Sequence, residues 1–109
     1  MAGPGSEPLR VALTTLPSPE AAEALAREAV AAGLAACAQV DGPVRSHYLW
    51  EGKASAAQEW RLTLKVAAER ETALRQWALE RHPYATPQWV VLAADASEAY
   101  REWVRLAGA

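Results

Sequence analysis

Apolar and polar residues alternate along several parts of the chain with the period of two that half-buried strands show. The pattern predicts four extended segments, at residues 9–14, 34–51, 59–66 and 89–93. The third is the most regular, and its apolar positions are Trp60, Leu62, Leu64 and Val66. Gly42-Pro43 interrupts the second segment, and because proline cannot donate to a sheet, a bulge, a kink or an edge position is expected there. Residues 51–55 predict a hairpin loop between the second and third segments.

Apolar residues recur at helical spacing in three other segments. The first helix is expected to begin at Ser18-Pro19, which offers an N-cap and a proline at the first helical position, and to end at Gly33. A second helix is predicted over 69–81 and ends before Pro83, with a buried stripe of Leu74, Trp77 and Ala78. A last helix is expected after Asp95 as its N-cap, with an apolar side of Tyr100, Trp103 and Val104.

The predicted order of elements is β-α-β-β-α-β followed by a C-terminal helix. This order defines an α+β fold of the ferredoxin-like, split βαβ type, in which one antiparallel sheet carries its helices on one face. A length of 109 residues suits one domain. We therefore expect a single domain over 9–109, preceded by a Gly- and Pro-rich, disordered tail over 1–8.

The opposite face of such a sheet is bare, and this predicts self-association. Tyr48 and Trp50 make that face apolar if they point towards it, and a large exposed apolar patch is seldom left open to water. The chain also contains five tryptophans, more bulk than a small core easily accommodates, and tryptophan is enriched at interfaces. These observations predict a homo-oligomer.

Charge and cysteine content exclude several classes of partner. The formal net charge is −2, so no overall positive field attracts nucleic acid. No apolar run approaches the roughly 20 residues of a membrane span. We therefore expect no nucleic-acid or membrane partner. A single cysteine, Cys37, suits a reducing compartment, and with the absence of a signal-like apolar stretch it predicts a cytoplasmic protein.

Catalytic motifs are missing from the sequence, and we expect a protein that is not an enzyme. There is no phosphate-binding glycine loop, no H-E-x-x-H and no nucleophile elbow. Cys37 lies among small residues, where a cysteine is either an apolar filler or, less commonly, a ligand or reactive thiol. His82 follows a helix and precedes a proline, so it is either a cation at the helix dipole or a metal ligand at a pocket mouth. His47 is expected on the surface.

Three segments together resemble the CutA divalent-cation (copper) tolerance family. They are residues 33–40 (GLAACAQV), 46–53 (SHYLWEGK) and 82–87 (HPYATP), in the family's order, and the resemblance covers nearly the whole chain. It implies a compact trimer similar in shape to the PII signalling proteins. It also implies a copper site in some members, built from a cysteine, the histidine of the second helix end, and a glutamate. Here those positions read Thr14, His82 and Gln88, so two of the three expected ligands are neutral oxygens.

The resemblance leads to three functional hypotheses. The first is a PII-like homotrimer that binds an unknown small ligand in inter-subunit clefts lined by Trp50, Glu59, Lys65, His82 and Tyr84. The second is a direct copper-binding chaperone or sink that uses His82 and Cys37. The third, a hydrolase or transferase with the same two residues, lacks an orienting acid at a recognisable spacing. No cofactor is required on this view, and a divalent metal such as copper is expected to bind weakly if it binds.

Overall fold

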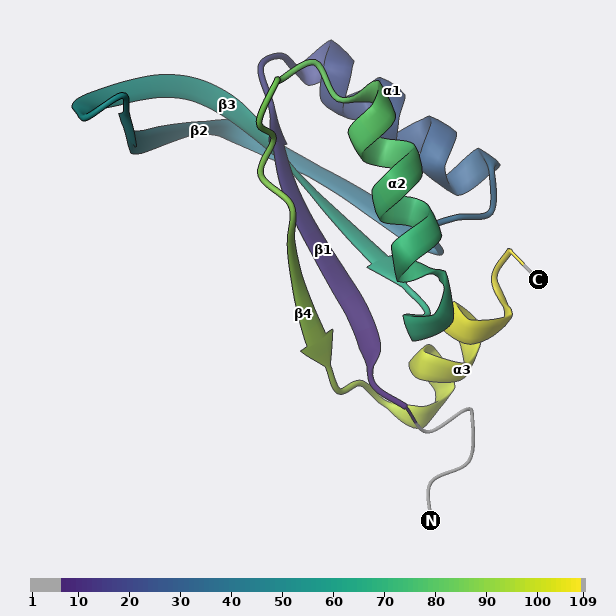
Figure 1. Cartoon of the computed structure of the whole chain (residues 1–109). Coiled ribbons are helices and arrows are strands. Elements are labelled where there is room, and N and C mark those ends of the chain that lie inside the picture. Colours follow the sequence, from purple (N-terminus) through teal and green to yellow (C-terminus); the bar gives the residue numbers. More distant parts are fainter. Residues whose placement is uncertain (1–6, 109) are drawn as a thin grey trace.

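The fold is a single four-stranded antiparallel sheet with three α-helices (Figure 1). The computed structural model describes residues 7–108, so most of the expected 1–8 tail lies outside the described residues. The strand order is β2-β3-β1-β4, which confirms the ferredoxin-like arrangement. The elements are β1 (Leu9–Leu16), α1 (Pro19–Ala31), β2 (Cys37–Trp50), β3 (Lys53–Val66), the short 3₁₀ turn η2 (Ala68–Arg70), α2 (Glu71–Arg81), β4 (Val90–Ala94) and α3 (Glu98–Leu106).

Helices α1 and α2 cover one face of the sheet and form the main core with it (Figure 1). Strand β3 supplies the centre of this core. Leu62 and Leu64, which the alternation predicted to be on its apolar face, are fully buried. The α1 stripe predicted from helical spacing packs onto them, and its buried members are Ala22, Leu25, Ala26 and Ala29. Ser18 caps α1 as expected, since its Oγ accepts from the Ala21 N–H at 3.1 Å.

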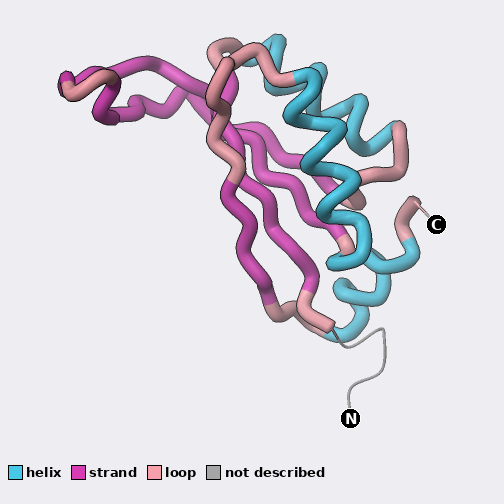
Figure 2. The backbone as a smooth tube through the Cα atoms, viewed as in Figure 1, coloured by secondary structure: helices cyan, strands magenta, loops and turns pink. Residues whose placement is uncertain are grey.

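Strands β2 and β3 are both 14 residues long and form a hairpin that extends well beyond the helical layer (Figure 2). The predicted irregularity at Gly42-Pro43 is confirmed, because the register shifts between Asp41 and Val44. The hairpin loop expected over 51–55 is shorter than predicted. Trp50 pairs directly with Lys53, so the turn is Glu51-Gly52, and both residues have positive φ as a two-residue hairpin turn requires.

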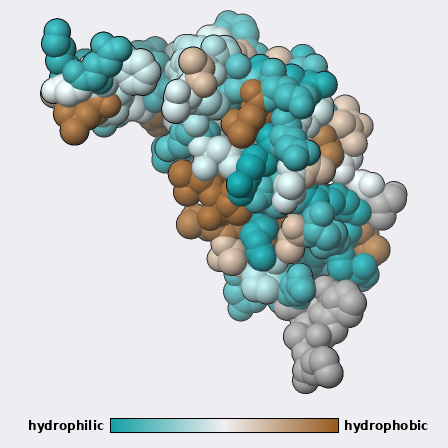
Figure 3. Space-filling view, viewed as in Figure 1, coloured by the Kyte–Doolittle hydropathy of each residue, from teal (hydrophilic) through white to brown (hydrophobic). Residues whose placement is uncertain are grey.

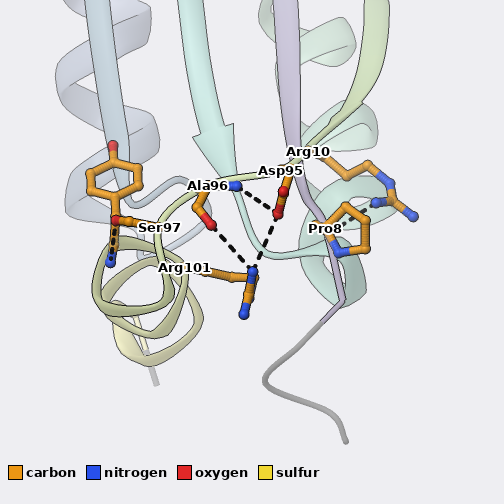
Figure 4. Close-up of polar contacts among 7 residues, drawn as sticks. Pro8, Arg10, Asp95, Ala96, Ser97 and Arg101 are labelled. Atoms are coloured by element: carbon orange, nitrogen blue, oxygen red, sulfur yellow. Dashed lines mark hydrogen bonds and ion pairs between the residues drawn. The ribbon is translucent and has the colours of Figure 1, made fainter. Parts of the chain in front are cut away.

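The start of α3 differs from the prediction in one detail (Figure 4). Ser97 is the N-cap, and its Oγ accepts from the Tyr100 N–H at 3.4 Å. Asp95 lies two residues earlier, where its Oδ1 accepts from the Ala96 N–H at 2.9 Å and from Arg101 Nη1 at 3.4 Å. Both Asp95 and Ser97 are good capping residues, and the chain direction after β4 selects the second.

Much of the sheet face away from α1 and α2 is exposed and apolar. Val90 and Leu92 of β4 are 42% and 51% exposed, and their β1 partners Leu13 and Val11 share that face. Figure 3 shows hydrophobic surface over β4 and at the end of the hairpin. The predicted apolar side of α3 is only partly buried within one chain, since Val104 is covered and Trp103 is 51% exposed. Among residues 7–108, no helix is long and apolar enough to cross a membrane.

Candidate functional site

His82 is fixed at the point where α2 ends and the chain turns back towards the sheet. Pro83 prevents the helix from continuing, and the His82 backbone is extended. The side chain is buried, with 9% of its surface exposed, and it lies against the end of β1. Its Nε2 is 2.9 Å from the Thr14 Oγ1. The helix end and the first strand therefore hold the imidazole in one orientation.

The hydrogen bonds of His82 select one neutral tautomer. The Tyr84 N–H donates to Nδ1 at 3.2 Å, so Nδ1 carries a lone pair and no proton. The proton of the neutral ring is then on Nε2, which donates to Thr14 Oγ1. Burial lowers the pKa of His82 below its ordinary value, although a hydrogen bond with the Thr15 backbone and the nearby Glu59 carboxylate act in the opposite direction. The ring is thus held neutral.

Tyr84 and Glu59 form the second part of the cluster. The Tyr84 hydroxyl donates to Glu59 Oε2 at 2.8 Å, which ties the segment after α2 to strand β3. Burial acts to raise the pKa of Glu59. Interactions with the side chains of Ser46, Tyr84 and Thr15 lower it by more, so the pKa of Glu59 is below its ordinary value. Burial and the bond to Glu59 raise the pKa of Tyr84 to about 12. Glu59 is therefore a carboxylate and Tyr84 a neutral phenol.

An open groove of about 870 Å³ lies between the hairpin and the segment that follows α2. Its size is within the range of small-molecule sites. Strands β1, β2 and β3 form one side, and residues 84–88 form the other. The lining residues are Thr15, Ser46, His47, Tyr48, Trp50, Ala57, Glu59, Tyr84, Ala85, Thr86, Pro87 and Gln88.

The structure brings most of the predicted cleft residues together and leaves one apart. Trp50, Glu59 and Tyr84 line the groove, and His82 lies behind Tyr84. Lys65 is six residues from Glu59 on the same strand, a distance of roughly 20 Å at the rise of a strand. Its Nζ donates to Gln39 Oε1 at 2.9 Å and lies 5.8 Å from the centre of the Tyr100 ring. Within one chain, Lys65 does not belong to this groove.

Cys37 lies at the same distant end of the sheet as Lys65, its direct partner in the β2–β3 register. It is partly buried and lies near Tyr100, and burial together with the nearby thiol raises the pKa of that tyrosine. His82 contacts Thr14, whereas Cys37 is level with Val11. One chain therefore does not bring the two predicted metal ligands together. Over residues 7–108, no group of three or more His, Cys, Asp or Glu side chains is placed to hold a metal ion.

Two of the three positions that the resemblance singled out are in contact. Thr14 is hydrogen-bonded to His82, and Gln88 lines the groove on the same side of the molecule. The threonine hydroxyl accepts a hydrogen bond from the ring Nε2–H, a role to which it is well suited. The substitutions therefore leave a hydrogen-bonded structural unit at this place, with no thiolate and with a neutral amide at the third position.

Sequence reasoning missed part of the groove. Thr15 and Ser46 were not predicted as site residues, yet both line the groove and help to lower the pKa of Glu59. Tyr48 was placed on the apolar sheet face, and His47 was expected on the surface, where it is indeed exposed although it also lines the groove. The one signal for Ser46 was its position in the 46–53 segment. The one signal for Thr15 was its place in residues 14–17, which resemble the end of the family's first strand, and its position near Glu59 depends on how β1 and β3 are paired.

The buried His82 couples folding to pH. The unfolded chain takes up a proton near the ordinary pKa of 6.5, whereas the native ring does so only at lower pH. The free energy of unfolding should therefore be highest above about pH 6.5 and fall as the pH decreases towards the native pKa. His82→Asn should make this slope shallower, while His47→Asn on the exposed hairpin should leave it unchanged. Urea denaturation at fixed protein concentration between about pH 7.5 and 5.5 measures the slope; equal slopes for all three proteins would refute the coupling.

The strand order, the paired helices and the long hairpin define a ferredoxin-like α+β domain. A family model described as the CutA1 divalent ion tolerance protein matches residues 10–107. The divalent-cation tolerance protein CutA of Escherichia coli is 35% identical over 95 residues, which are 86% of this chain and 85% of that protein. The chain belongs to the CutA1 divalent ion tolerance family.

Solved structures agree with this assignment. CutA from Synechococcus elongatus PCC7942 has a TM-score of 0.88 and 39% identity, covering 94% of this chain and 92% of that one. A PII-like protein CutA from Nostoc sp. PCC 7120, in its apo form, has a TM-score of 0.82 and 35% identity over 88% of this chain and 93% of that one. The fold is thus shared with a structure described as PII-like, and the family is described by cation tolerance rather than by a reaction.

Proposed function

We propose that this chain is a homotrimeric, PII-like module that binds a small ligand and has no catalytic activity. The observation that carries the proposal is the groove between the hairpin and residues 84–88, with a buried carboxylate and aromatic side chains in its wall. Its volume of about 870 Å³ is enough for a metabolite-sized molecule. The groove is open on one side, so a neighbouring subunit is expected to complete it and make it an inter-subunit cleft.

Exposed apolar side chains support the trimer. Leu49 and Trp50, at the tip of the hairpin, are 77% and 56% exposed in the single chain, and Leu92 is 51% exposed on the bare sheet face. These positions lie far apart on a molecule 49 Å long, which favours contacts with two different neighbours over one two-fold contact. Trp50 was predicted to add to an exposed apolar face, and it is exposed within one chain; in the proposed trimer the neighbour and the ligand cover it together. A cytoplasmic location remains a prediction from the single cysteine.

Native mass spectrometry tests this function directly. The protein, exchanged into a volatile buffer after incubation with the small-molecule fraction of a cell extract, should appear as a trimer carrying additional bound mass. Tyr84→Ala should remove that mass while the trimer persists. An Arg27→Ala variant is the control, because Arg27 is exposed on α1 and is not among the residues that line the groove. Retention of the bound mass by Tyr84→Ala would place the ligand elsewhere, and its absence from the wild-type protein would contradict the proposal.

A direct copper chaperone or sink is the alternative, and we expect only weak copper binding. A metal needs a free lone pair on the ring, but Nδ1 of His82 accepts from Tyr84 and Nε2 carries the proton. Binding would therefore break one of these hydrogen bonds, and Thr14 and Gln88 supply no negative charge in return.

Isothermal titration with copper at neutral pH measures this expectation. Any binding should be weaker than about 1 µM and should be mostly lost in His82→Ala, with Cys37→Ser as a parallel variant. A submicromolar site in each subunit that persists in His82→Ala would favour the alternative and place the metal in another part of the molecule.

A further inference from the structure

Glu59 carries a negative charge that the described part of the chain does not neutralise. The residue is 8% exposed, the Tyr84 hydroxyl donates to its Oε2 at 2.8 Å, and the side chains of Thr15 and Ser46 are near enough to help lower its pKa. Among residues 7–108, no lysine or arginine forms an ion pair with it, although five other ion pairs are present. His82 is nearby but is held neutral by its two hydrogen bonds. Buried carboxylates are normally paired with a cation. Glu59 is an exception within one chain, because it has no positively charged partner there.

The wall around Glu59 suits a cation with an apolar body. The aromatic side chains of Tyr48, Trp50 and Tyr84 line the same groove, and none of its lining residues is a lysine or an arginine. Aromatic faces attract ammonium and guanidinium groups, and they also cover apolar carbon. An anionic ligand would instead meet the carboxylate at short range with no positive charge to offset it.

We propose that the groove selects a small organic cation, whose ammonium or guanidinium group pairs with Glu59 and whose apolar part packs against Trp50 and Tyr84. This inference rests on the proposed binding function and specifies its ligand class. Glu59 has capacity for another donor, since a carboxylate accepts about four hydrogen bonds and the hydroxyls of Tyr84, Thr15 and Ser46 can supply at most three. The Tyr84 hydroxyl and the burial of the side chain hold the carboxylate in place, so the ligand meets a preorganised acceptor.

Three probes of matched shape test the charge preference. Phenethylammonium, phenethyl alcohol and hydrocinnamate share a phenyl ring on a short chain and differ in charge. Each is titrated into the isotopically labelled protein at neutral pH, and binding is followed at the indole N–H of Trp50, assigned with Trp50→Phe. We expect the cation to bind about tenfold more tightly than the alcohol and the carboxylate to bind most weakly, because hydrogen bonds to charged groups are the strong ones.

Variants then locate the charge. Glu59→Gln should reduce the affinity for the cation about tenfold and leave the affinity for the alcohol nearly unchanged, whereas Glu51→Gln in the exposed hairpin turn should change neither. Equal affinities of the three probes for the wild-type protein would overturn the inference, even if Glu59→Gln folds poorly. A basic side chain from a neighbouring subunit that already forms an ion pair with Glu59 and excludes the cation would overturn it as well. If the alcohol or carboxylate binds best, the ligand class is wrong while the binding function stands; if no probe perturbs Trp50, both fail.

Discussion

We expect Leu92→Glu to convert the assembly from a trimer to a monomer. Leu92 is 51% exposed on β4 and lies beside Val11 on the sheet face that α1 and α2 leave open. In the proposed trimer this face is covered, so the substitution buries a carboxylate without a partner, a change that costs several kcal/mol. Sedimentation equilibrium at micromolar concentration should give about three times the 11.7 kDa of one chain for the wild type and about that mass itself for the variant.

Ala93→Glu is the matched control for this prediction. It introduces the same charge one residue along the same strand, and because side chains alternate it points to the other face of the sheet. Ala93 is already exposed, so the control should remain trimeric. If the wild-type protein sediments as a monomer or a dimer, or if both variants dissociate equally, the bare face is not the interface that we infer.

The second large effect is expected from the core beneath α2. Leu74 is fully buried against the sheet, and Leu74→Ala should lower the free energy of unfolding by about 2–5 kcal/mol through lost burial and the cavity left behind. A loss of this size is a large fraction of the stability of a small domain. Chemical denaturation at fixed protein concentration provides the measurement.

Leu79→Ala tests whether burial is the cause. Leu79 lies on the same helix and is 38% exposed, so the same substitution there should cost less than about 1 kcal/mol. Both changes place alanine in a helix, and the difference between them therefore isolates packing from helix propensity. Equal losses for the two variants would mean that α2 is not oriented on the sheet as described.

The fold was largely predictable because its local signals agree with its global packing. The alternation in β3 marked Leu62, Leu64 and Val66, which are buried, and Trp60, which is partly buried. The helical stripe in α1 is buried as predicted, and the expected irregularity occurs at Gly42-Pro43. The errors are local. Asp95 and Ser97 are both capable N-caps, and the hairpin turn needs only Glu51-Gly52 because Gly52 adopts a positive φ without strain.

The site was predictable only where a local motif marked it. His82 and Tyr84 belong to one short segment, and its prolines indicated a fixed loop. The Glu59–Tyr84 hydrogen bond joins residues 25 positions apart, and it depends on how the segment after α2 returns to the sheet. Lys65 shows what periodicity leaves open. Lys65 lies on the same face of β3 as Glu59, but six residues of the strand separate them. The period of two predicts which face of the sheet a side chain is on, but it does not predict which residues of that face lie close together.

A crystal structure of the trimer, soaked in the small-molecule fraction of a cell extract, tests the central claim most directly. The account predicts density for a bound molecule in the groove, in contact with Glu59 and beside Tyr84, with a neighbouring subunit closing the open side. Density beside Cys37 and Tyr100 at the other end of the sheet, or a groove filled by protein side chains with no space left for a ligand, would contradict it.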